Sequence, residues 1–328
     1  MASEIAVPRA GELLARMAGR RIVVIGDVMI DEWIWGRVSR ISPEAPVPVV
    51  AVHDHSFTLG GSGNVASNLR ALGAAVTFVG AVGNDAEGER VRALFADIDC
   101  DTAGLLVLDD RPTTRKTRVV AHNQQVVRAD WESTAALRDA DRARIVDAVR
   151  RAVAGADAVV LSDYAKGLLH RDVVEAALAA SVVVADPKPG NVAMFAGVTC
   201  IAPNVAEAAR ASGIPVVDEA SLERAARSLL DRLACRYVLV TRGEGGMSLF
   251  GSDGTAEHIP AVARTVFDVS GAGDTVVAVL TLALAAHVPV TTATRLANFA
   301  AGAVVEKLGT ATASPAEIVA LMEHDAER

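Results

Sequence analysis

Short runs of apolar, often β-branched residues recur along the chain and predict buried β-strands. The first run is RIVVIGD at residues 21–27, which ends in a glycine and an aspartate. Apolar residues at successive positions are typical of strands that are buried on both faces, as in parallel sheets. Similar runs lie at residues 75–83, 156–164, 181–189, 199–204 and 237–243.

The segments between most of these runs carry apolar residues at the spacing of amphipathic helices. Strands that alternate with such helices predict βαβ units and a parallel sheet that is covered on both faces. The predicted fold class is therefore α/β, with a central, mostly parallel sheet. The predicted helical segments lie at residues 64–73, 87–98, 142–155 and 221–234.

Two segments break this alternation of strands and helices. Residues 47–60 and 113–130 look like extended strands in which polar and apolar residues partly alternate. We expect them to form a small β-sheet that acts as a lid over the active-site edge. Because no Ser-, Gly- or Pro-rich linker interrupts the sequence, we expect residues 1–328 to form one domain with this lid.

Composition narrows the possible functions. The chain has 328 residues, of which 51% are hydrophobic, and its net charge of −8 without a long basic block argues against nucleic acid as a main ligand. The N-terminus lacks the apolar core of a signal peptide, and the longest apolar stretch, residues 276–286, is too short to span a bilayer. Cys100, Cys200 and Cys235 follow no metal-ligand spacing, so we expect reduced thiols in a cytoplasmic protein that does not bind membranes.

Polar residues follow several of the predicted strands. Ligands of open α/β sheets bind at the carboxyl ends of the strands, so these residues are candidates for one common site. Helix capping and turn formation are the alternative for each of them. The residues are Asp27 and Asp31, Asp163 and Lys166, Asp186 and Lys188, Asn204 and Glu207, and Thr241 and Gly243.

The segment DVSGAGDTVVAVL places a carboxylate between a glycine-rich turn and a long apolar run. Gly271, Ala272 and Gly273 allow a tight turn whose backbone N–H groups point the same way, and a helix that begins there would complete an anion site. Asp274 would lie in the first helical turn, where it could accept the proton of a hydroxyl that attacks a phosphoryl group. The alternative is a plain helix start, with Ser270 or Asp274 as its cap.

A second glycine-rich segment, LGGSGNVASNLRALG, also opens a predicted helix. It lacks the Gly-Lys-Ser/Thr ending of a P-loop, and the first strand is followed by GDVMID rather than GxGxxG, which argues against a nicotinamide-dependent oxidoreductase. Gly60 and Gly61 suit a close approach of the backbone to a polyhydroxyl ligand, and Asn64 could add a bidentate side chain. Tight packing of the helix against the sheet is the alternative.

Asn204 and Glu207 lie three residues apart and therefore share one face of a predicted helix start. Near a triphosphate, Glu207 could hold Mg²⁺ through water, because this ion keeps much of its water shell. A capping box uses the same residue types at the same spacing.

The motifs GGSGN, NVAE and DVSGAGD follow one another in this order. In that order they resemble the motifs of the ribokinase-like family of sugar and nucleoside kinases, and the resemblance covers about residues 21–320. It implies a central α/β sheet with a β lid, and the use of ATP and Mg²⁺. It also implies that Asp274 is the catalytic base and that the amides of residues 271–273 form the anion hole.

Within this family, three further segments resemble the kinases of D-glycero-D-manno-heptose 7-phosphate. They are residues 26–50, which contain SRISPEAPVPVV, residues 122–130 and residues 296–318. The implied reaction is ATP-dependent phosphorylation of the C1 hydroxyl to the 1,7-bisphosphate. Such kinases often form the N-terminal half of a bifunctional kinase/adenylyltransferase. Because the sequence ends at residue 328, we expect a kinase without an adenylyltransferase domain, and a separate adenylyltransferase for the next step.

The resemblance also implies which residues bind the sugar phosphate. A 7-phosphate needs cations, and Lys116, Arg118 and Arg128 on the second lid segment are candidates, since arginine forms bidentate phosphate contacts. A solvated lid face is the alternative for each of them. Lids of this family often pair between subunits, which implies a homodimer. The sugar hydroxyls and the pocket walls are assigned to Asp27, Asp31, Gly60, Gly61 and Asn64.

On the nucleotide side, Lys188 is assigned to the ATP phosphates or to the sugar. Asp268 is assigned to the anion hole or to a site for a monovalent cation such as K⁺. A kinase of another sugar or sugar phosphate and a non-catalytic sugar-phosphate sensor are the alternative functions. The remaining residues expected around the nucleotide are Asn204, Val205, Ala206, Glu207, Thr241, Gly243 and Asn298.

Overall fold

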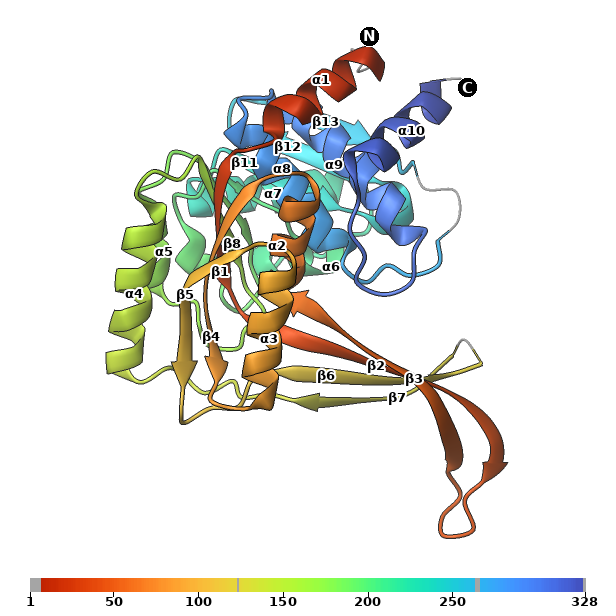
Figure 1. Ribbon diagram of the computed structural model, residues 1–328. Helices are drawn as coiled ribbons and strands as arrows, with labels where there is room; N and C mark the ends of the chain where they lie inside the picture. Colours follow the sequence, from red (N-terminus) through yellow and green to blue (C-terminus); the bar gives the residue numbers. More distant parts are fainter. Residues whose placement is uncertain (1–6, 123, 263–265, 327–328) are drawn as a thin grey trace.

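A computed structural model describes residues 7–122, 124–262 and 266–326. Its centre is a nine-stranded sheet in the order β13-β12-β11-β10-β9-β8-β1-β4-β5 (Figure 1). Neighbouring strands from β5 to β11 are parallel, whereas β12 and β13 pair antiparallel. The bounds are β1 (Arg21–Gly26), β4 (Ala75–Gly83), β5 (Asp101–Leu108), β8 (Ala158–Ser162), β9 (Val183–Asp186), β10 (Cys200–Ile201), β11 (Tyr237–Thr241), β12 (Met247–Gly251) and β13 (Ala256–Ile259).

The α/β fold class predicted from the sequence is confirmed. Each of the six apolar runs contains one of the parallel strands, β1, β4, β8, β9, β10 or β11. The pattern does not predict β5, β12 and β13, which lie at the two ends of the sheet. In β5, exposed or half-buried residues alternate with buried ones, so this strand lacks the continuous apolar run of its neighbours.

Helices cover both faces of the central sheet, also as predicted. Successive side chains of a strand point to opposite faces, and in β1 Ile22 and Val24 join one core while Val23 and Ile25 join the other. The first core includes α1 (Val7–Met17), α2 (Ser62–Ala71), α3 (Ala86–Asp97), α8 (Ala272–Ala285), α9 (Val290–Val305) and α10 (Pro315–Ala326), and the second includes α4 (Asp139–Val153), α5 (Arg171–Ala177), α6 (Val205–Ser212) and α7 (Glu219–Leu233).

The longest apolar stretch of the chain forms α8. Its residues from Asp274 to Ala283 are buried all round, which is typical of a helix in the interior of a large core. Among the described residues, none of the helices combines the length and the apolar character that crossing a bilayer requires.

A second, four-stranded sheet, which we call the lid sheet, has the order β3-β2-β6-β7. The two predicted lid segments supply β3, β6 and β7, apart from residue 123, which lies outside the described residues. The central strand β2 is not predicted, because its first six residues are all buried and show no alternation. The bounds are β2 (Val28–Ile41), β3 (Pro48–Gly61), β6 (Arg115–Ala121) and β7 (Gln124–Trp131).

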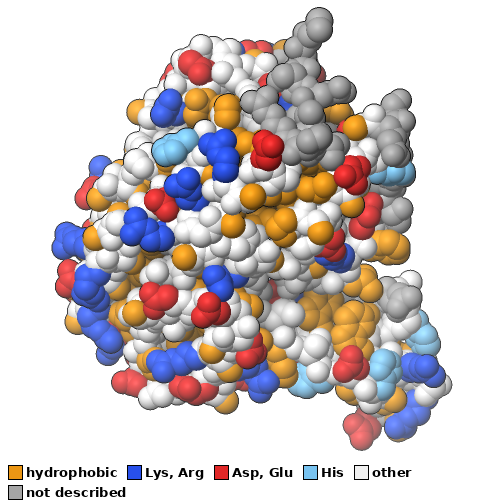
Figure 2. All heavy atoms as spheres, turned by 45° about the horizontal axis from the view of Figure 1, so that its top comes forward, with side chains coloured by type: hydrophobic (Ala, Val, Ile, Leu, Met, Phe, Trp, Pro, Cys, Tyr) orange, Lys and Arg blue, Asp and Glu red, His pale blue; other side chains and the backbone are white. Residues whose placement is uncertain are grey.

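The lid sheet is tied to the main body at its base. Arg115 Nη1 lies 2.7 Å from Glu87 Oε1 of α3, and the guanidinium of Arg90 lies 3.7 Å from the ring centroid of Phe57. The far end of the β2–β3 hairpin projects away from the body (Figure 1). Hydrophobic side chains are exposed there beside basic residues and histidines (Figure 2).

Candidate active site

Asp274 lies in the first turn of α8 and is 6% exposed. The residue before this helix, Gly271, has a φ of 79°, in the left-handed region that favours glycine. A Cβ atom at this position would lie 2.5 Å from Asn64 Nδ2. Within the described residues no side chain caps the start of α8. The alternative interpretation of the sequence, in which Ser270 or Asp274 is the helix cap, therefore does not hold.

Two side chains from distant elements hold the Asp274 carboxylate. Asn64 of α2 donates from Nδ2 to Oδ2 at 2.9 Å, and the hydroxyl of Tyr164, two residues after β8, donates to Oδ1 at 2.7 Å. Burial raises the pKa of Asp274 to about 6, although both hydrogen bonds lower it. A carboxylate with a pKa this close to neutrality can take up and release a proton near physiological pH, as a general base must.

The helix start that carries Asp274 borders a small cavity of about 160 Å³. The cavity collects residues from the ends of β8, β9 and β11 and from the starts of α6 and α8, which is the placement expected for a ligand site in an α/β sheet. The first-turn amides of a helix have no carbonyl partner within that helix, although here the Ala272 N–H lies 3.3 Å from Val269 O. The lining residues are Tyr164, Asp186, Lys188, Ala202, Asn204, Glu207, Thr241, Gly271, Gly273 and Asp274.

Besides Asp274, one cation and two carboxylates line this cavity. Lys188 Nζ lies 2.7 Å from Glu207 Oε1 and 3.9 Å from Asp186 Oδ2. Burial lowers the pKa of the Lys188 ammonium, but the two carboxylates outweigh it and the pKa rises. Burial also raises the pKa of Asp186, to about 7. Glu207 and Asn204 form the capping box of α6, so the capping alternative is confirmed while both residues still line the cavity.

Asp27 is at the end of the first strand, as predicted, but its carboxylate faces the protein backbone. Its two oxygens accept hydrogen bonds from the backbone N–H groups of Tyr164, Lys166 and Leu168 at 3.0–3.2 Å. Asp163 accepts from the N–H of Ala165 at 2.8 Å. The geometry therefore gives Asp27 a structural task, which is to hold the loop that carries Tyr164. The sugar-binding role stays a prediction.

Asp31 and Arg118 form a buried ion pair on the inner face of the lid sheet. An Arg118 Nη1 group donates to Asp31 Oδ1, and the guanidinium lies 4.9 Å from the ring centroid of Trp33. A Cβ atom at Gly60 would lie 2.3 Å from Asp31 Oδ2, so glycine is needed there to make room for the carboxylate. Thr58 and Thr310 close the edge of this region with a hydroxyl contact of 2.8 Å.

The other two predicted phosphate ligands are paired with acids. Lys116 Nζ lies 3.1 Å from Asp130 and 3.6 Å from Glu132, and Arg128 Nε lies 2.9 Å from Asp130. Lys166 also approaches Glu132, at 2.8 Å. Arg128 is half exposed and fits the alternative of a solvated lid face better than the more buried Lys116 does.

A family model described as pfkB family carbohydrate kinase matches residues 20–317 of the chain. The chain belongs to the pfkB family of carbohydrate kinases. The order of its three motifs indicates the same family. The resemblance to ribokinase-like sugar kinases is therefore confirmed.

Two curated relatives of this carbohydrate kinase are both named bifunctional protein HldE. The protein of Trichlorobacter lovleyi is 44% identical over 319 residues, which are 95% of this chain and 65% of the relative. The protein of Desulfatibacillum aliphaticivorans is 46% identical over 308 residues, which are 92% of this chain and 63% of the relative. The chain thus spans less than two thirds of the length of these relatives.

Solved structures show the same fold at lower identity. Ribokinase of Arabidopsis thaliana, complexed with ribose and ATP, has a TM-score of 0.72 at 20% identity and covers 93% of this chain and 99% of its own. Phosphofructokinase-2 of Escherichia coli, in complex with potassium, has a TM-score of 0.79 at 19% identity and covers 94% of this chain and 99% of its own.

The structure places the remaining predicted residues around the same edge of the sheet. The Asn298 amide donates to Pro260 O at 2.8 Å, so this side chain holds a loop. Asp268 accepts from the N–H of Ser270 at 2.9 Å and of Gly309 at 3.0 Å, and thus fixes the turn before α8. Val205 and Ala206 form the first turn of α6, and Gly243 lies just after β11.

Sequence reasoning missed Tyr164, whose hydroxyl donates directly to the Asp274 carboxylate. Its only signal is the dipeptide Asp163-Tyr164 after a predicted strand, and of the two the sequence singled out the aspartate as a candidate. Among the described residues no cluster of three or more His, Cys, Asp or Glu side chains is arranged to hold a metal directly.

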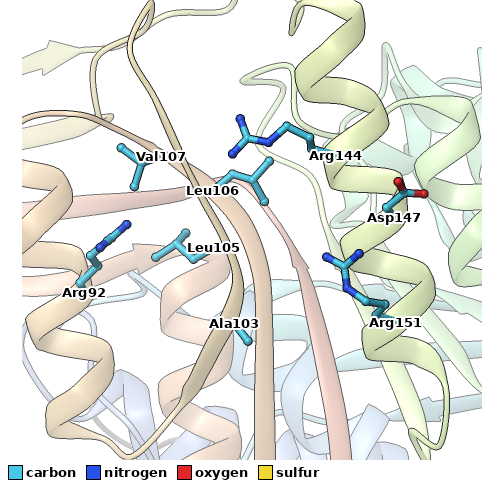
Figure 3. A pocket seen from close by; sticks show the side chains of 8 residues that line it. All are labelled: Arg92, Ala103, Leu105, Leu106, Val107, Arg144, Asp147 and Arg151. Carbon is cyan, nitrogen blue, oxygen red and sulfur yellow. The ribbon is translucent and has the colours of Figure 1, made fainter.

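A separate groove lies over the edge strand β5. Arg92 of α3 and Arg144 and Arg151 of α4 border it (Figure 3). No predicted site residue lines this groove, so it plays no part in the candidate active site.

We predict that Gly271→Ala lowers kcat by about tenfold or more, because the new Cβ would displace Asn64 from Asp274 and left-handed backbone is strained for alanine. Steady-state kinetics would measure this loss. Gly11→Ala is a matched control, since no heavy atom lies within 4 Å of its Cβ position. Wild-type kcat in Gly271→Ala would contradict the proposed tight packing around the carboxylate.

Proposed function

We propose that the chain transfers the γ-phosphoryl group of ATP to the C1 hydroxyl of D-glycero-D-manno-heptose 7-phosphate. The observation that carries the kinase chemistry is Asp274, buried at a helix start and held by two donors beside a cavity. The heptose assignment is supported by the resemblance of residues 26–50 and 296–318 and by relatives that are 44–46% identical. Because the chain spans only 63–65% of those relatives, the proposal concerns the kinase reaction alone.

In the proposed reaction the sugar lies under the lid sheet and the nucleotide lies in the cavity beside Lys188. Asp274 accepts the proton of the C1 hydroxyl while its oxygen attacks the γ-phosphorus and the bond from phosphorus to ADP breaks. The amides at residues 271–273 and the dipole of α8 stabilise the negative charge that develops on the phosphoryl oxygens. Asn204, Glu207 and Thr241 border the cavity on the nucleotide side.

The acidic lining of the cavity suits Mg²⁺. This hard cation prefers carboxylate and water oxygens, and the carboxylates of Asp186 and Glu207 border the cavity. Glu207 would hold the ion through water, since its own oxygens already bind Lys188 and the backbone of Asn204. Mg²⁺, when bound, neutralises charge on the phosphate oxygens. Asp268 accepts two backbone N–H groups, which favours its role in organising the anion hole over direct binding of K⁺.

The charges of the lid sheet support a phosphorylated sugar. Arg118, Lys116 and Lys166 are cationic and at most 15% exposed, and they lie on or beside the lid sheet. A substrate phosphate could replace the carboxylates that now pair with the lysines. A phosphorylated hexose or an isomeric heptose phosphate would satisfy the same cations and is the alternative substrate class.

We also propose that two copies of the chain pair through the lid sheet. Large hydrophobic side chains are exposed on this sheet, among them Ile41, Val52 and Val127. Apolar groups that are exposed together on a projecting sheet favour association.

An assay of ADP release with Mg-ATP tests the proposed substrate. It compares D-glycero-D-manno-heptose 7-phosphate with fructose 6-phosphate, ribose and sedoheptulose 7-phosphate. We expect the manno-heptose phosphate to give the highest kcat/KM. Preference for another sugar would contradict the heptose assignment. No turnover with any of the four sugars would favour the alternative of a non-catalytic sugar-phosphate sensor.

Asp274→Asn tests the base. We expect kcat to fall by about 10²–10⁴-fold with little change in the binding of ATP or sugar, because the amide keeps the shape of the side chain but cannot accept the proton. Asp139→Asn is the matched control, since Asp139 is an exposed carboxylate in the first turn of α4. A near-normal kcat in Asp274→Asn would show that the base is another group.

Arg118→Ala tests the lid cations. We expect KM for the sugar phosphate to rise about tenfold or more while KM for ATP changes little, because a charge-assisted contact to the sugar phosphate is lost. Arg37→Ala removes an exposed arginine of the same sheet and serves as the control. Equal changes in both KM values would argue against a phosphate-binding role for Arg118.

A further inference from the structure

Tyr164 is the one tyrosine that touches the proposed base. Its hydroxyl donates to Asp274 Oδ1 at 2.7 Å, while Asn64 donates to Oδ2 at 2.9 Å. Each carboxylate oxygen therefore receives one side-chain donor and keeps a lone pair for a further partner. Of these two donors, Tyr164 lines the cavity proposed for the nucleotide, whereas Asn64 does not.

The backbone around Tyr164 is fixed independently of the base. The Tyr164 N–H donates to Asp27 Oδ2 at 3.0 Å, and the neighbouring Ala165 N–H donates to Asp163. The ring lies close to Gly61, where a Cβ would be 3.5 Å from Cδ2, and Lys188 Nζ lies 5.3 Å from the ring centroid. The phenol is therefore held against Asp274 by the hydrogen-bonded loop that carries it, as a preorganised donor must be.

We propose that Tyr164 is a positioning residue that keeps the Asp274 carboxylate oriented and ionised until the sugar hydroxyl reaches it. This inference rests on the proposed role of Asp274 as base. The phenol donates a hydrogen bond but keeps its proton throughout, and the proton of the sugar hydroxyl goes to Asp274 alone.

The charges that face Asp274 make this donor necessary. Burial and the negative charge of Asp31 on β2 raise the pKa of Asp274, and the negative charge of Asp274 in turn raises the pKa of Asp186 at the end of β9. The hydrogen bonds from Asn64 and Tyr164 and the ammonium of Lys188 lower it. Without the phenol, more of the base would be protonated at neutral pH and unable to accept a proton.

The phenol is suited to stay neutral. Burial, and then the negative charge of Asp274, raise the pKa of Tyr164 well above its ordinary range. A neutral phenol can only donate to an ionised carboxylate when it binds it, so the pair favours the charged form of Asp274. A phenylalanine would fill the same space without supplying the donor.

Tyr164→Phe tests the inference through the pH profile of kcat. Activity depends on the ionised base, so it is lost as the pH falls through the pKa of Asp274. Losing a donor raises that pKa, and we expect the acidic limb to move up by about one pH unit. Because the pKa of Asp274 is about 6, this move lowers the ionised fraction by about twofold at neutral pH and by about tenfold at pH values well below 6, and kcat should fall by the same factors and recover toward alkaline pH. Tyr237→Phe is the matched control, because it removes the only other tyrosine of the chain.

A second measurement is independent of activity. In the Tyr237→Phe protein, Tyr164 is the only tyrosine, so the ultraviolet absorbance of tyrosinate reports its ionisation. We expect ionisation well above the ordinary range, and a clear downward move when Asp274→Asn is added, because the neighbouring negative charge is gone.

The outcomes separate this inference from the proposed function. An acidic limb that does not move in Tyr164→Phe, with Asp274→Asn inactive, overturns the inference about Tyr164 and leaves the base in place. An unchanged tyrosine titration after Asp274→Asn also overturns it. Full activity of Asp274→Asn instead overturns the proposed base. If the acidic limb of the kcat profile moves in Tyr164→Phe and the tyrosine titration responds to Asp274→Asn, both the role of Tyr164 and the role of Asp274 as base are supported.

Discussion

The site depends on one constraint, which is to keep a carboxylate both buried and charged at the start of a helix. An isolated carboxylate in such a place loses its hydration and takes up a proton instead. Around Asp274 this loss is offset by the hydrogen bonds from Asn64 and Tyr164 and by the ammonium of Lys188. The two side-chain donors are 210 and 110 residues away in the sequence. The hydrogen bonds that favour the charged carboxylate of Asp274 therefore form only when α2, α8 and the loop after β8 are packed together.

The same constraint explains the ion pairs around the base. Asp31 would raise the pKa of Asp274 further, and its own burial is balanced by Arg118 on the lid sheet. On the other side, Lys188 lies between Asp186 and Glu207. Each buried acid beside the base thus has a cation within reach, and removing one partner would leave an uncompensated charge in the interior. Three acids, Asp186, Glu207 and Asp274, still line the cavity with the single ammonium of Lys188, which suits the proposed binding of Mg²⁺ there.

The parts of the fold and site that follow from local sequence could be predicted. The parallel strands show as apolar runs, and Asp274 could be predicted because the turn, the helix start and the carboxylate lie within a few residues. Tyr164 could not, because its partner is far away in sequence and a tyrosine after a strand has many common roles. The strand β2 was hidden since burial on both faces removes the alternation that marks a lid strand. The position of Asp27 at the end of the first strand could be predicted. The direction in which its carboxylate oxygens point could not, because it depends on the loop whose N–H groups they accept.

The glycine motifs can be recognised in the sequence because only glycine fits in the small space beside the carboxylates of Asp31 and Asp274. A Cβ at Gly60 would meet Asp31, and a Cβ at Gly271 would meet Asn64. Residues 60–64 thus approach Asp31 through the first glycine and bind Asp274 through the asparagine, at the junction of β3 and α2. A single short segment therefore sets the separation between the lid and the base. Because that separation is fixed by backbone packing, any larger residue at these two positions must displace a side chain on which the charge of the site depends.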